Sequence, residues 1–411
     1  MAPILINLVG IVAILLIAFL LSTGKKRISL RVVGATFALQ ALMALLVLRT
    51  PWGVQLIQAL SNGVIALLDY SKVGIEAIFG PMGANPFTNT FVIAALPVIV
   101  FFAAIVSILY HWGIMQRLVR WVGGAIGWIT GISKVEALGS AANIFVGQSE
   151  SPLVVRAYFA RMSRADLFQV MVLAMATISG AILILYATTL SRTVPDAVGH
   201  MISASLISLP AALLIAKLMV PGEASAEGEG PDAGSQGLKF ESSIDAIIKG
   251  TMDGMQLFLA VIAVIIVVFA LVSLADQLLA LLPMVDGEPL SLKRTFGWLF
   301  SPLMWLIGVP WAEAQAAGSL MGTKAILNEY VAYLELAALP PSTFAPRSLL
   351  IVTYALCGVA NLASIGLLVS TIGTLCPERR AEVAGLGVRS WIAGNMATAM
   401  TGAWIGLITW V

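Results

Sequence analysis

The fold of this chain is decided by residues 117–150, which read RLVRWVGGAIGWITGISKVEALGSAANIFVGQSE, and by their counterpart at 294–329, which reads RTFGWLFSPLMWLIGVPWAEAQAAGSLMGTKAILNE. Six residues recur 177 positions further on: Arg117, Trp121, Trp128, Gly131, Glu136 and Ala137 match Arg294, Trp298, Trp305, Gly308, Glu313 and Ala314. After one or two inserted residues, Gly139-Ser140 and Glu150 match Gly318-Ser319 and Glu329. Paired polar, helix-breaking segments in an apolar chain predict a transporter built from internal repeats, with its substrate site between them.

Composition places the chain in a membrane. Of its 411 residues, 59% are hydrophobic and 11% are charged, and the mean hydropathy is +0.97. Such a chain cannot shield its apolar surface from water as a soluble globule. We therefore expect an all-α polytopic membrane protein surrounded by lipid. The net charge is only +2, and no basic stripe is interleaved with aromatic residues, so nucleic acid is not an expected partner.

Eight apolar stretches come near or exceed the roughly 20 residues that span a bilayer. They lie near 4–22, 32–48, 91–112, 167–190, 198–219, 255–282, 348–375 and 388–411. Basic residues follow the first stretch and none precedes it. The positive-inside rule therefore predicts an outside amino terminus and, after eight crossings, an outside carboxyl terminus. A cleaved signal peptide would carry its basic residues first.

The polar segments fit this topology only as re-entrant hairpins. We expect 131–158 to enter and leave the membrane on the cytoplasmic side and 309–336 to do so on the outer side. Three spans separate them, so the second copy is inverted relative to the first, as in transporters with two related routes to one site. The Trp-rich pieces 114–130 and 291–308, and also 52–72, predict interfacial helices.

The same pattern divides the chain into five regions. Residues 221–242, rich in Gly, Ser, Ala and Glu, predict a flexible cytoplasmic linker. The regions are 1–112 (scaffold spans 1 to 3 with an interfacial helix), 113–197 (interfacial helix, hairpin 1 and broken span 4), 198–290 (spans 5 and 6 with the linker), 291–387 (interfacial helix, hairpin 2 and broken span 7) and 388–411 (span 8).

The tip of hairpin 1 carries the chemistry. The residues Gln148, Ser149 and Glu150 lie between Gly147 and Pro152, within an otherwise apolar segment. A carboxylate at membrane depth costs about 2.5–3.5 kcal/mol even on a lenient scale, which indicates a function. The alternative is that Glu150 only caps or pairs inside the bundle. An amide, a hydroxyl and a carboxylate in sequence favour a recognition edge for a polar ligand.

Hairpin 2 repeats the pattern with Asn328 and Glu329, although Lys324 could neutralise that carboxylate. The span after each hairpin is interrupted, by 177–180 in the first copy and by Gly358, Asn361 and Ser364 in the second. Small residues alone would indicate helix packing. Polar groups at every break predict instead a site for a hydrophilic solute.

Other functions find less support. The two cysteines, Cys357 and Cys376, lie in or at the end of one apolar stretch and are read as packing residues. An intramembrane hydrolase would need a nucleophile with a base or a metal cluster, and His111 and His200 lie far from the hairpins in sequence. Carboxylates at both tips favour an occluding site over a passive channel for small polar solutes. We expect neither enzymatic activity nor a cofactor.

Three motifs together resemble the concentrative nucleoside transporters over nearly the whole chain. They are the run from Asn143 to Leu153, the run from Gly318 to Lys324 leading to Asn328-Glu329, and the run from Tyr354 to Gly358 followed by Asn361 and Ser364. The resemblance to bacterial members implies cation-coupled nucleoside uptake in the inner membrane. It also implies a homotrimer, in which hairpins and broken spans form an elevator-like transport domain.

The resemblance further implies roles for individual residues. Gln148, Ser149 and Glu150 would bind the nucleobase, with Ile182 packing against it, and Glu329, Asn361 and Ser364 would bind the ribose. The small aliphatic residues Ile182 and Val359 leave the choice between uridine-like and adenosine-like substrates open.

The sodium ligands implied by the resemblance are Asn143, Val146, Thr177 and Ile178, which offer the oxygen atoms that a hard cation prefers. The chain departs from the family's commonest pattern at Ser149, where threonine is usual, and at Thr177, where serine is usual. Both changes keep the hydroxyl. Proton coupling through Glu150 or Glu329 is the alternative to sodium.

Overall fold

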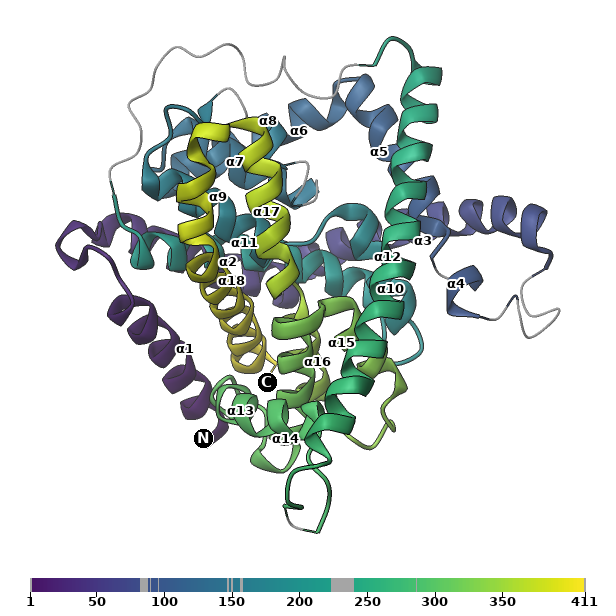
Figure 1. Ribbon diagram of the computed structural model, residues 1–411. Coiled ribbons are helices and arrows are strands. Elements are labelled where there is room, and N and C mark those ends of the chain that lie inside the picture. The colour runs from purple at the N-terminus through teal and green to yellow at the C-terminus, as the bar shows by residue number, and fades with distance from the viewer. Residues whose placement is uncertain are drawn as a thin grey trace.

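The computed structural model describes residues 2–81, 88, 90–94, 96–145, 148, 151–155, 158–222, 240–285 and 287–409. Across these residues every regular element is a helix, apart from one isolated bridge between Val285 and Glu288. The all-α prediction is therefore confirmed. Figure 1 shows the helices gathered around the long α18 (Arg380–Ile408), with α12 (Ser243–Leu279) along one side.

The remaining helices follow the predicted order. Before the first copy lie α1 (Ala2–Leu20), η1 (Lys25–Arg27), α2 (Leu30–Arg49), α3 (Pro51–Phe79), α4 (Phe91–Ala94) and α5 (Val98–His111). The first copy comprises α6 (Ile114–Thr130), α7 (Lys134–Phe145), α8 (Ser151–Val154), α9 (Arg164–Ala176) and α10 (Gly180–Leu190), and α11 (Ala197–Met219) follows it. The second copy comprises α13 (Leu292–Leu306), α14 (Trp311–Gly322), the π-helix η3 (Thr323–Leu327), α15 (Glu329–Ala338), α16 (Pro346–Leu356) and α17 (Leu362–Leu375), and η4 (Pro377–Arg379) follows it.

Four of the described helices are long and apolar enough to cross a membrane unbroken, namely α2, α3, α11 and α12. A fifth candidate is the pair α5 and α6, which is bent by 78°. That bend lies at Gly113, whose φ of 71° suits glycine. It separates the expected span 91–112 from the expected interfacial helix 114–130. All eight expected stretches contain helix, and the number that cross the bilayer stays a prediction.

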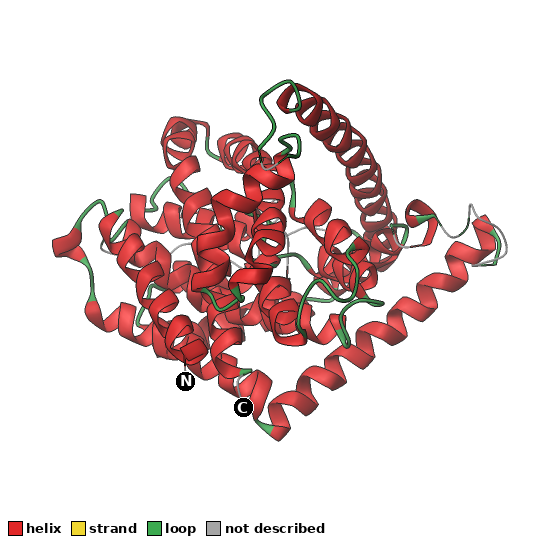
Figure 2. Ribbon diagram, turned by 90° about the horizontal axis from the view of Figure 1, so that it is seen from below, coloured by secondary structure: helices red, strands yellow, loops and turns green. Residues whose placement is uncertain are grey.

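The helix α3 is longer than the interfacial helix expected at 52–72. Its 29 residues would suffice to span a membrane by length and composition. However, it runs across the direction of α12 in two perpendicular views (Figures 1 and 2). This direction suits a helix in the plane of the membrane, so we keep the interfacial prediction.

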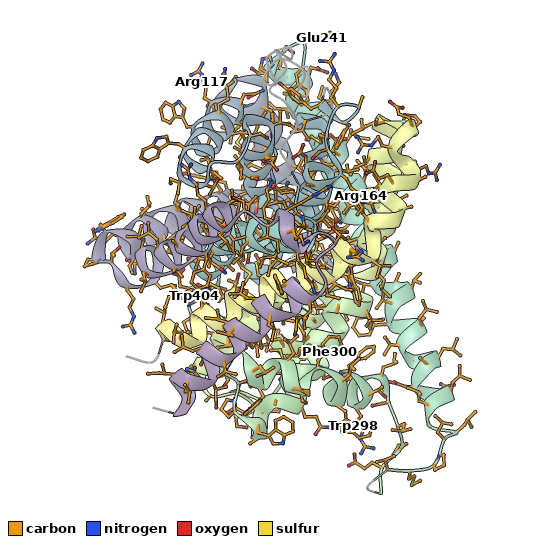
Figure 3. All side chains as sticks on the ribbon, turned by 90° about the vertical axis from the view of Figure 1, so that its left-hand side faces the viewer. Arg117, Arg164, Glu241, Trp298, Phe300 and Trp404 are labelled. Carbon is orange, nitrogen blue, oxygen red and sulfur yellow. The ribbon has the colours of Figure 1, made fainter. Side chains whose placement is uncertain are left out.

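The repeat is visible in the backbone. The helices α7 and α14 have 12 residues each and begin 177 positions apart. Each follows a glycine with positive φ, Gly131 at 71° and Gly308 at 108°. The two copies begin at opposite ends of α12, as Figure 1 shows for α6 and α7 against α13 and α14, and Figure 3 for Arg117 against Trp298. The hairpins therefore enter from opposite ends, as the inverted repeat requires.

The two broken helices cross at the centre of the molecule. The first break covers 177–179 and the second covers 357–361. A Cβ at Gly358 would lie 2.9 Å from the Ala176 carbonyl oxygen, at the end of α9. The helix α18 packs against both breaks, because a Cβ at Gly394 would lie 2.7 Å from Met175 Cβ, and Asn395 Nδ2 donates to the Ala360 oxygen at 3.0 Å.

The helices of the first expected region, 1–112, pack against two different parts of the molecule. The α1 residue Asn7 is fully buried and donates to the Ile307 oxygen at 2.7 Å and the Ala403 oxygen at 3.0 Å. The helices α1 and α2 thus join α13 and α18, and Arg49 of α2 donates to the Ile408 oxygen. By contrast, α5 packs along α12 through close approaches at Gly250 and Gly254. The division of the chain into five regions stays a prediction.

Candidate functional site

Glu329 lies at the centre of the site. After the π-helix η3, Asn328 adopts an extended conformation and its Oδ1 accepts from the Tyr330 amide at 2.7 Å, which starts α15 at Glu329. The Glu329 side chain is buried. Its Oε1 accepts from the Tyr186 hydroxyl at 2.6 Å and its Oε2 from Asn361 Nδ2 at 2.7 Å. Both oxygens of this buried carboxylate therefore have a neutral hydrogen-bond donor.

Asn361 and Ser364 connect this carboxylate to hairpin 1. Asn361 caps α17, and its Oδ1 accepts from the Ser364 amide at 2.9 Å. This bond fixes the orientation of the amide and directs Nδ2 toward Glu329. The Ser364 hydroxyl accepts from Gln148 Nε2 at 3.3 Å, so the tip of hairpin 1 reaches the second broken helix. Gln148 Oε1 is buried with no partner among the described residues.

Sequence reasoning missed Tyr186, on α10. Its ring is almost fully buried and stacks on Tyr330 with centroids 5.7 Å apart, and it also contacts the ring of Tyr333 at 4.9 Å. These contacts aim the hydroxyl at Glu329. A signal was present, because Tyr186 follows Ile182 by four residues and shares its face of a helix.

The other predicted nucleobase residues are only partly placed. Ile182 is half-buried in the first turn of α10, where its amide donates to the Ser179 hydroxyl. Ser149 and Glu150 lie outside the described residues. The structure therefore brings together Gln148, Glu329, Asn361 and Ser364 from two hairpins and one break.

The predicted sodium ligands form a second cluster at the first break. The Thr177 hydroxyl contacts the Asn143 backbone oxygen at 3.2 Å and the Leu173 oxygen at 2.9 Å. Asn143 Nδ2 donates to the Gly139 oxygen at 2.9 Å, while Asn143 Oδ1 is buried with no partner among the described residues. Ile178 is buried beside Thr177, and Val146 lies outside the described residues. An unpartnered oxygen among other oxygens suits a hard cation.

Lys324 does not neutralise Glu329 by direct contact. Its side chain is completely buried, and its Nζ donates to the Ala355 backbone oxygen at 3.0 Å and to Thr398 Oγ1 at 2.6 Å. Within the described part of the chain no ion pair joins it to Glu329. Lys324 therefore makes no direct ion pair with Glu329, whose oxygens accept from two neutral donors. Whether Lys324 neutralises the carboxylate from a distance stays a prediction.

Three protein-family models match successive parts of the chain. The model described as the N-terminus of the Na+ dependent nucleoside transporters matches residues 9–82, and the model described as their C-terminus matches 200–406. Between them, a model described as nucleoside recognition matches residues 92–193. Both breaks and both hairpins fall within these matches.

Individual relatives match over almost their full length. The chain is 36% identical to the uncharacterized transporter YutK of Bacillus subtilis over 98% of each protein. It is 32% identical to the nucleoside permease NupC of Helicobacter pylori over 98% of this chain and 97% of that one.

Solved structures match as well. The structure of CNTnw in an inward-facing substrate-bound state has a TM-score of 0.89 and 36% identity, over 98% of this chain and 99% of that chain. A double variant of CNTnw in an outward-facing state has a TM-score of 0.92 and 35% identity, over 99% and 98% of the chains.

Proposed function

The chain belongs to the Na+ dependent nucleoside transporter family, and we propose that it imports nucleosides by sodium symport. Membership confirms the resemblance noted in the sequence and makes the chain a membrane protein. The observation that carries the proposal is the buried Glu329 carboxylate, held between Tyr186 and Asn361 where both hairpins and both broken helices converge.

Ribose recognition is assigned to Glu329, Asn361 and Ser364. A carboxylate oxygen accepts more than one hydrogen bond, so each Glu329 oxygen keeps capacity for a sugar hydroxyl beside its present donor. The nucleobase is assigned to hairpin 1, through Gln148, Ser149 and Glu150, with Ile182 packing against the ring. The unpartnered Gln148 Oε1 supports this assignment, because a buried acceptor lacks a donor that the base can supply.

The sodium site is assigned to Asn143, Val146, Thr177 and Ile178. When bound, sodium couples uptake to its own gradient. One ion moving down a tenfold gradient and a 100 mV potential supplies about 1.4 and about 2.3 kcal/mol. Together these support a nucleoside accumulation of roughly 500-fold. Proton coupling through Glu150 or Glu329 is the second candidate.

Alternating access is proposed to follow an elevator motion of the hairpins and broken helices in a homotrimeric scaffold. Support comes from the first helices of the two hairpins, α7 and α14, which lie at opposite ends of α12. Further support comes from CNTnw, which is described in both inward-facing and outward-facing states. We place the chain in a bacterial inner membrane with both termini outside.

The test is uptake of radiolabelled uridine and adenosine into proteoliposomes. A sodium gradient at fixed pH should drive accumulation, whereas a pH gradient without sodium should not. Equal uptake under the pH gradient alone would favour proton coupling. Failure of both nucleosides under either gradient would overturn the substrate assignment.

Two matched pairs of variants locate the sites. Glu329→Gln should weaken uridine binding by about 10-fold to 100-fold, because a bond to a charged group contributes about 1.5–3 kcal/mol. Glu335→Gln is the control, since Glu335 lies on the same helix and pairs with Lys293 at 3.1 Å.

Thr177→Val should raise the sodium concentration that gives half-maximal uptake, because it removes a hydroxyl from the proposed sodium site. Thr188→Val is its control and should leave that concentration unchanged, because the Thr188 hydroxyl donates to the Ile184 oxygen of its own helix.

A further inference from the structure

The turn that precedes Glu329 is wider than an α-helical turn and ends abruptly. In η3 the Asn328 amide donates to the Thr323 oxygen at 3.0 Å, five residues back instead of the four of an α-helix. Asn328 itself is extended, so the hydrogen-bond ladder stops there. The last carbonyls of a helical segment need donors from elsewhere. The position of Glu329, directly after this turn, therefore depends on what holds the turn from outside.

The helix α18 holds the turn at two consecutive residues. The Trp391 indole nitrogen donates to the oxygen of the buried Ala325 at 2.8 Å. The neighbouring Lys324 donates to Thr398 Oγ1 at 2.6 Å. Trp391 and Thr398 are seven residues apart, which places them two turns apart on one face of the helix. A tryptophan that only anchors a helix in the membrane interface directs its polar end to the headgroup region. The N–H of Trp391 is bound instead by the backbone of the hairpin.

The same face of α18 also holds the second break. Asn395 lies four residues after Trp391, and its Nδ2 donates to the Ala360 oxygen at 3.0 Å. Asn361, which follows Ala360, donates to Glu329 Oε2 at 2.7 Å. One face of a continuous helix therefore fixes the segments on both sides of the hydrogen bond between Asn361 and Glu329.

We propose that Trp391 is a positioning residue for ribose recognition. Its indole N–H holds η3 on the helix face that also holds the second break, and so sets how Glu329 and Asn361 present their polar atoms to the sugar. The inference rests on the proposed ribose assignment. Loss of this N–H should weaken recognition of the sugar hydroxyls more than recognition of the rest of the nucleoside.

Trp391→Phe removes the N–H and keeps an aromatic ring. Trp404→Phe is the matched control, because Trp404 is buried on the same helix and its Nε1 has no partner among the described residues. Binding of uridine and of 2′,3′-dideoxyuridine, which lacks the 2′ and 3′ hydroxyls, is measured in nanodiscs at saturating sodium. Hydrogen exchange of peptides that cover 323–331 is measured without nucleoside.

We expect Trp391→Phe to weaken uridine binding by about 3-fold to 10-fold, which corresponds to one neutral hydrogen bond. Binding of dideoxyuridine should change by less than about twofold, because that ligand has no 2′ or 3′ hydroxyl to donate to the carboxylate. Exchange in 323–331 should rise, since the turn has lost a donor from outside. Trp404→Phe should leave both affinities and this exchange at the parental values.

Two results would overturn the inference. One is parental uridine binding in Trp391→Phe. The other is equal weakening of both ligands, which would indicate altered packing of the ring. If Trp391→Phe does not fold, β-(3-benzothienyl)alanine at position 391 replaces the N–H by sulfur in a ring of the same shape, and the same outcomes apply.

A failure of the ribose assignment would be seen in the parent protein. If the parent binds dideoxyuridine as tightly as uridine, that assignment fails and the role of Trp391 in ribose recognition fails with it. Raised exchange of 323–331 in Trp391→Phe would still show that the indole N–H holds the turn.

Discussion

At the scale of single residues, the site depends on how a buried carboxylate is held before substrate arrives. The two carboxylate oxygens of Glu329 accept hydrogen bonds, one from the Tyr186 hydroxyl and the other from Asn361 Nδ2. The ring of Tyr186 is fixed by stacking on the ring of Tyr330. Because these donors already hold the carboxylate in place, little further conformational entropy is lost when the ligand binds. Tyr186 therefore positions Glu329, and each carboxylate oxygen still has capacity for a ribose hydroxyl.

Tyr186→Phe tests this role. We expect uridine binding to weaken by about 10-fold to 100-fold, because a buried carboxylate oxygen loses a donor at about 1.5–3 kcal/mol. The readout is equilibrium binding at saturating sodium. Tighter or unchanged binding would show that the hydroxyl competes with ribose or is irrelevant.

Tyr333→Phe is the control for Tyr186→Phe. Tyr333 is also fully buried in the same aromatic cluster, but its hydroxyl donates to the Thr353 backbone oxygen at 2.9 Å instead of to Glu329. The variant should lower the melting temperature without a comparable loss of uridine affinity. If Tyr333→Phe lost as much uridine affinity as Tyr186→Phe, the effect of both substitutions would be assigned to the packing of the aromatic rings.

At the scale of elements, the breaks of the two interrupted helices pack directly against each other. Gly358 has a φ of 151°, and a Cβ there would lie 2.6 Å from Thr398 Cγ2 as well as 2.9 Å from the Ala176 oxygen. The second break is therefore packed against the first by a residue that only glycine suits. Residues of the proposed ribose site and sodium site lie on either side of this crossing.

Gly358→Ala should disturb both sites together. Strain of about 1–3 kcal/mol is expected at this backbone conformation. We expect a lower melting temperature, weaker uridine binding and a higher sodium requirement. Gly366→Ala on α17 is the control, because a Cβ there meets no atom within 4 Å. Loss of uridine binding with normal sodium dependence would show that the two breaks act separately.

At the scale of the whole molecule, α12 packs mainly against α5, and α5 in turn packs against α10, the helix that carries Tyr186. None of the described site residues lies on α5 or α12. These two helices approach closely at Gly254, where a Cβ would lie 2.7 Å from Val100 Cα. Much of the rest of α12 exposes apolar side chains, which suits lipid or a second copy of the chain in the proposed trimer.

Gly254→Val should therefore weaken the fold more than the site. Overpacking costs about 1–3 kcal/mol, so the melting temperature should fall. Uridine affinity should change by less than about tenfold, which corresponds to 1.4 kcal/mol. Gly74→Val is the control, because Gly74 is helical and exposed with no atom within 4 Å of a Cβ. A large loss of affinity with parental stability would connect α12 directly to substrate binding.

The sequence by itself determined the membrane class, the inverted repeat and the positions of the helix breaks. Hydrophobicity, glycine and repeated polar residues act locally, so the breaks at 177–179 and 357–361 lie where the residues predicted interruptions, except that Ser364 lies within α17. Its carboxylate and amide residues also marked the centre of the site, because ionisable groups are rare at membrane depth.

Only the tertiary structure decided which partners those groups have. Tyr186 meets Glu329 across 143 residues of chain, and Lys324 meets Thr398 across 74. Neither contact follows from spacing, because the approach of two helices depends on small residues elsewhere, such as Gly358 and Gly394. A buried polar group takes the partner that packing brings within reach, and packing is a property of the whole fold.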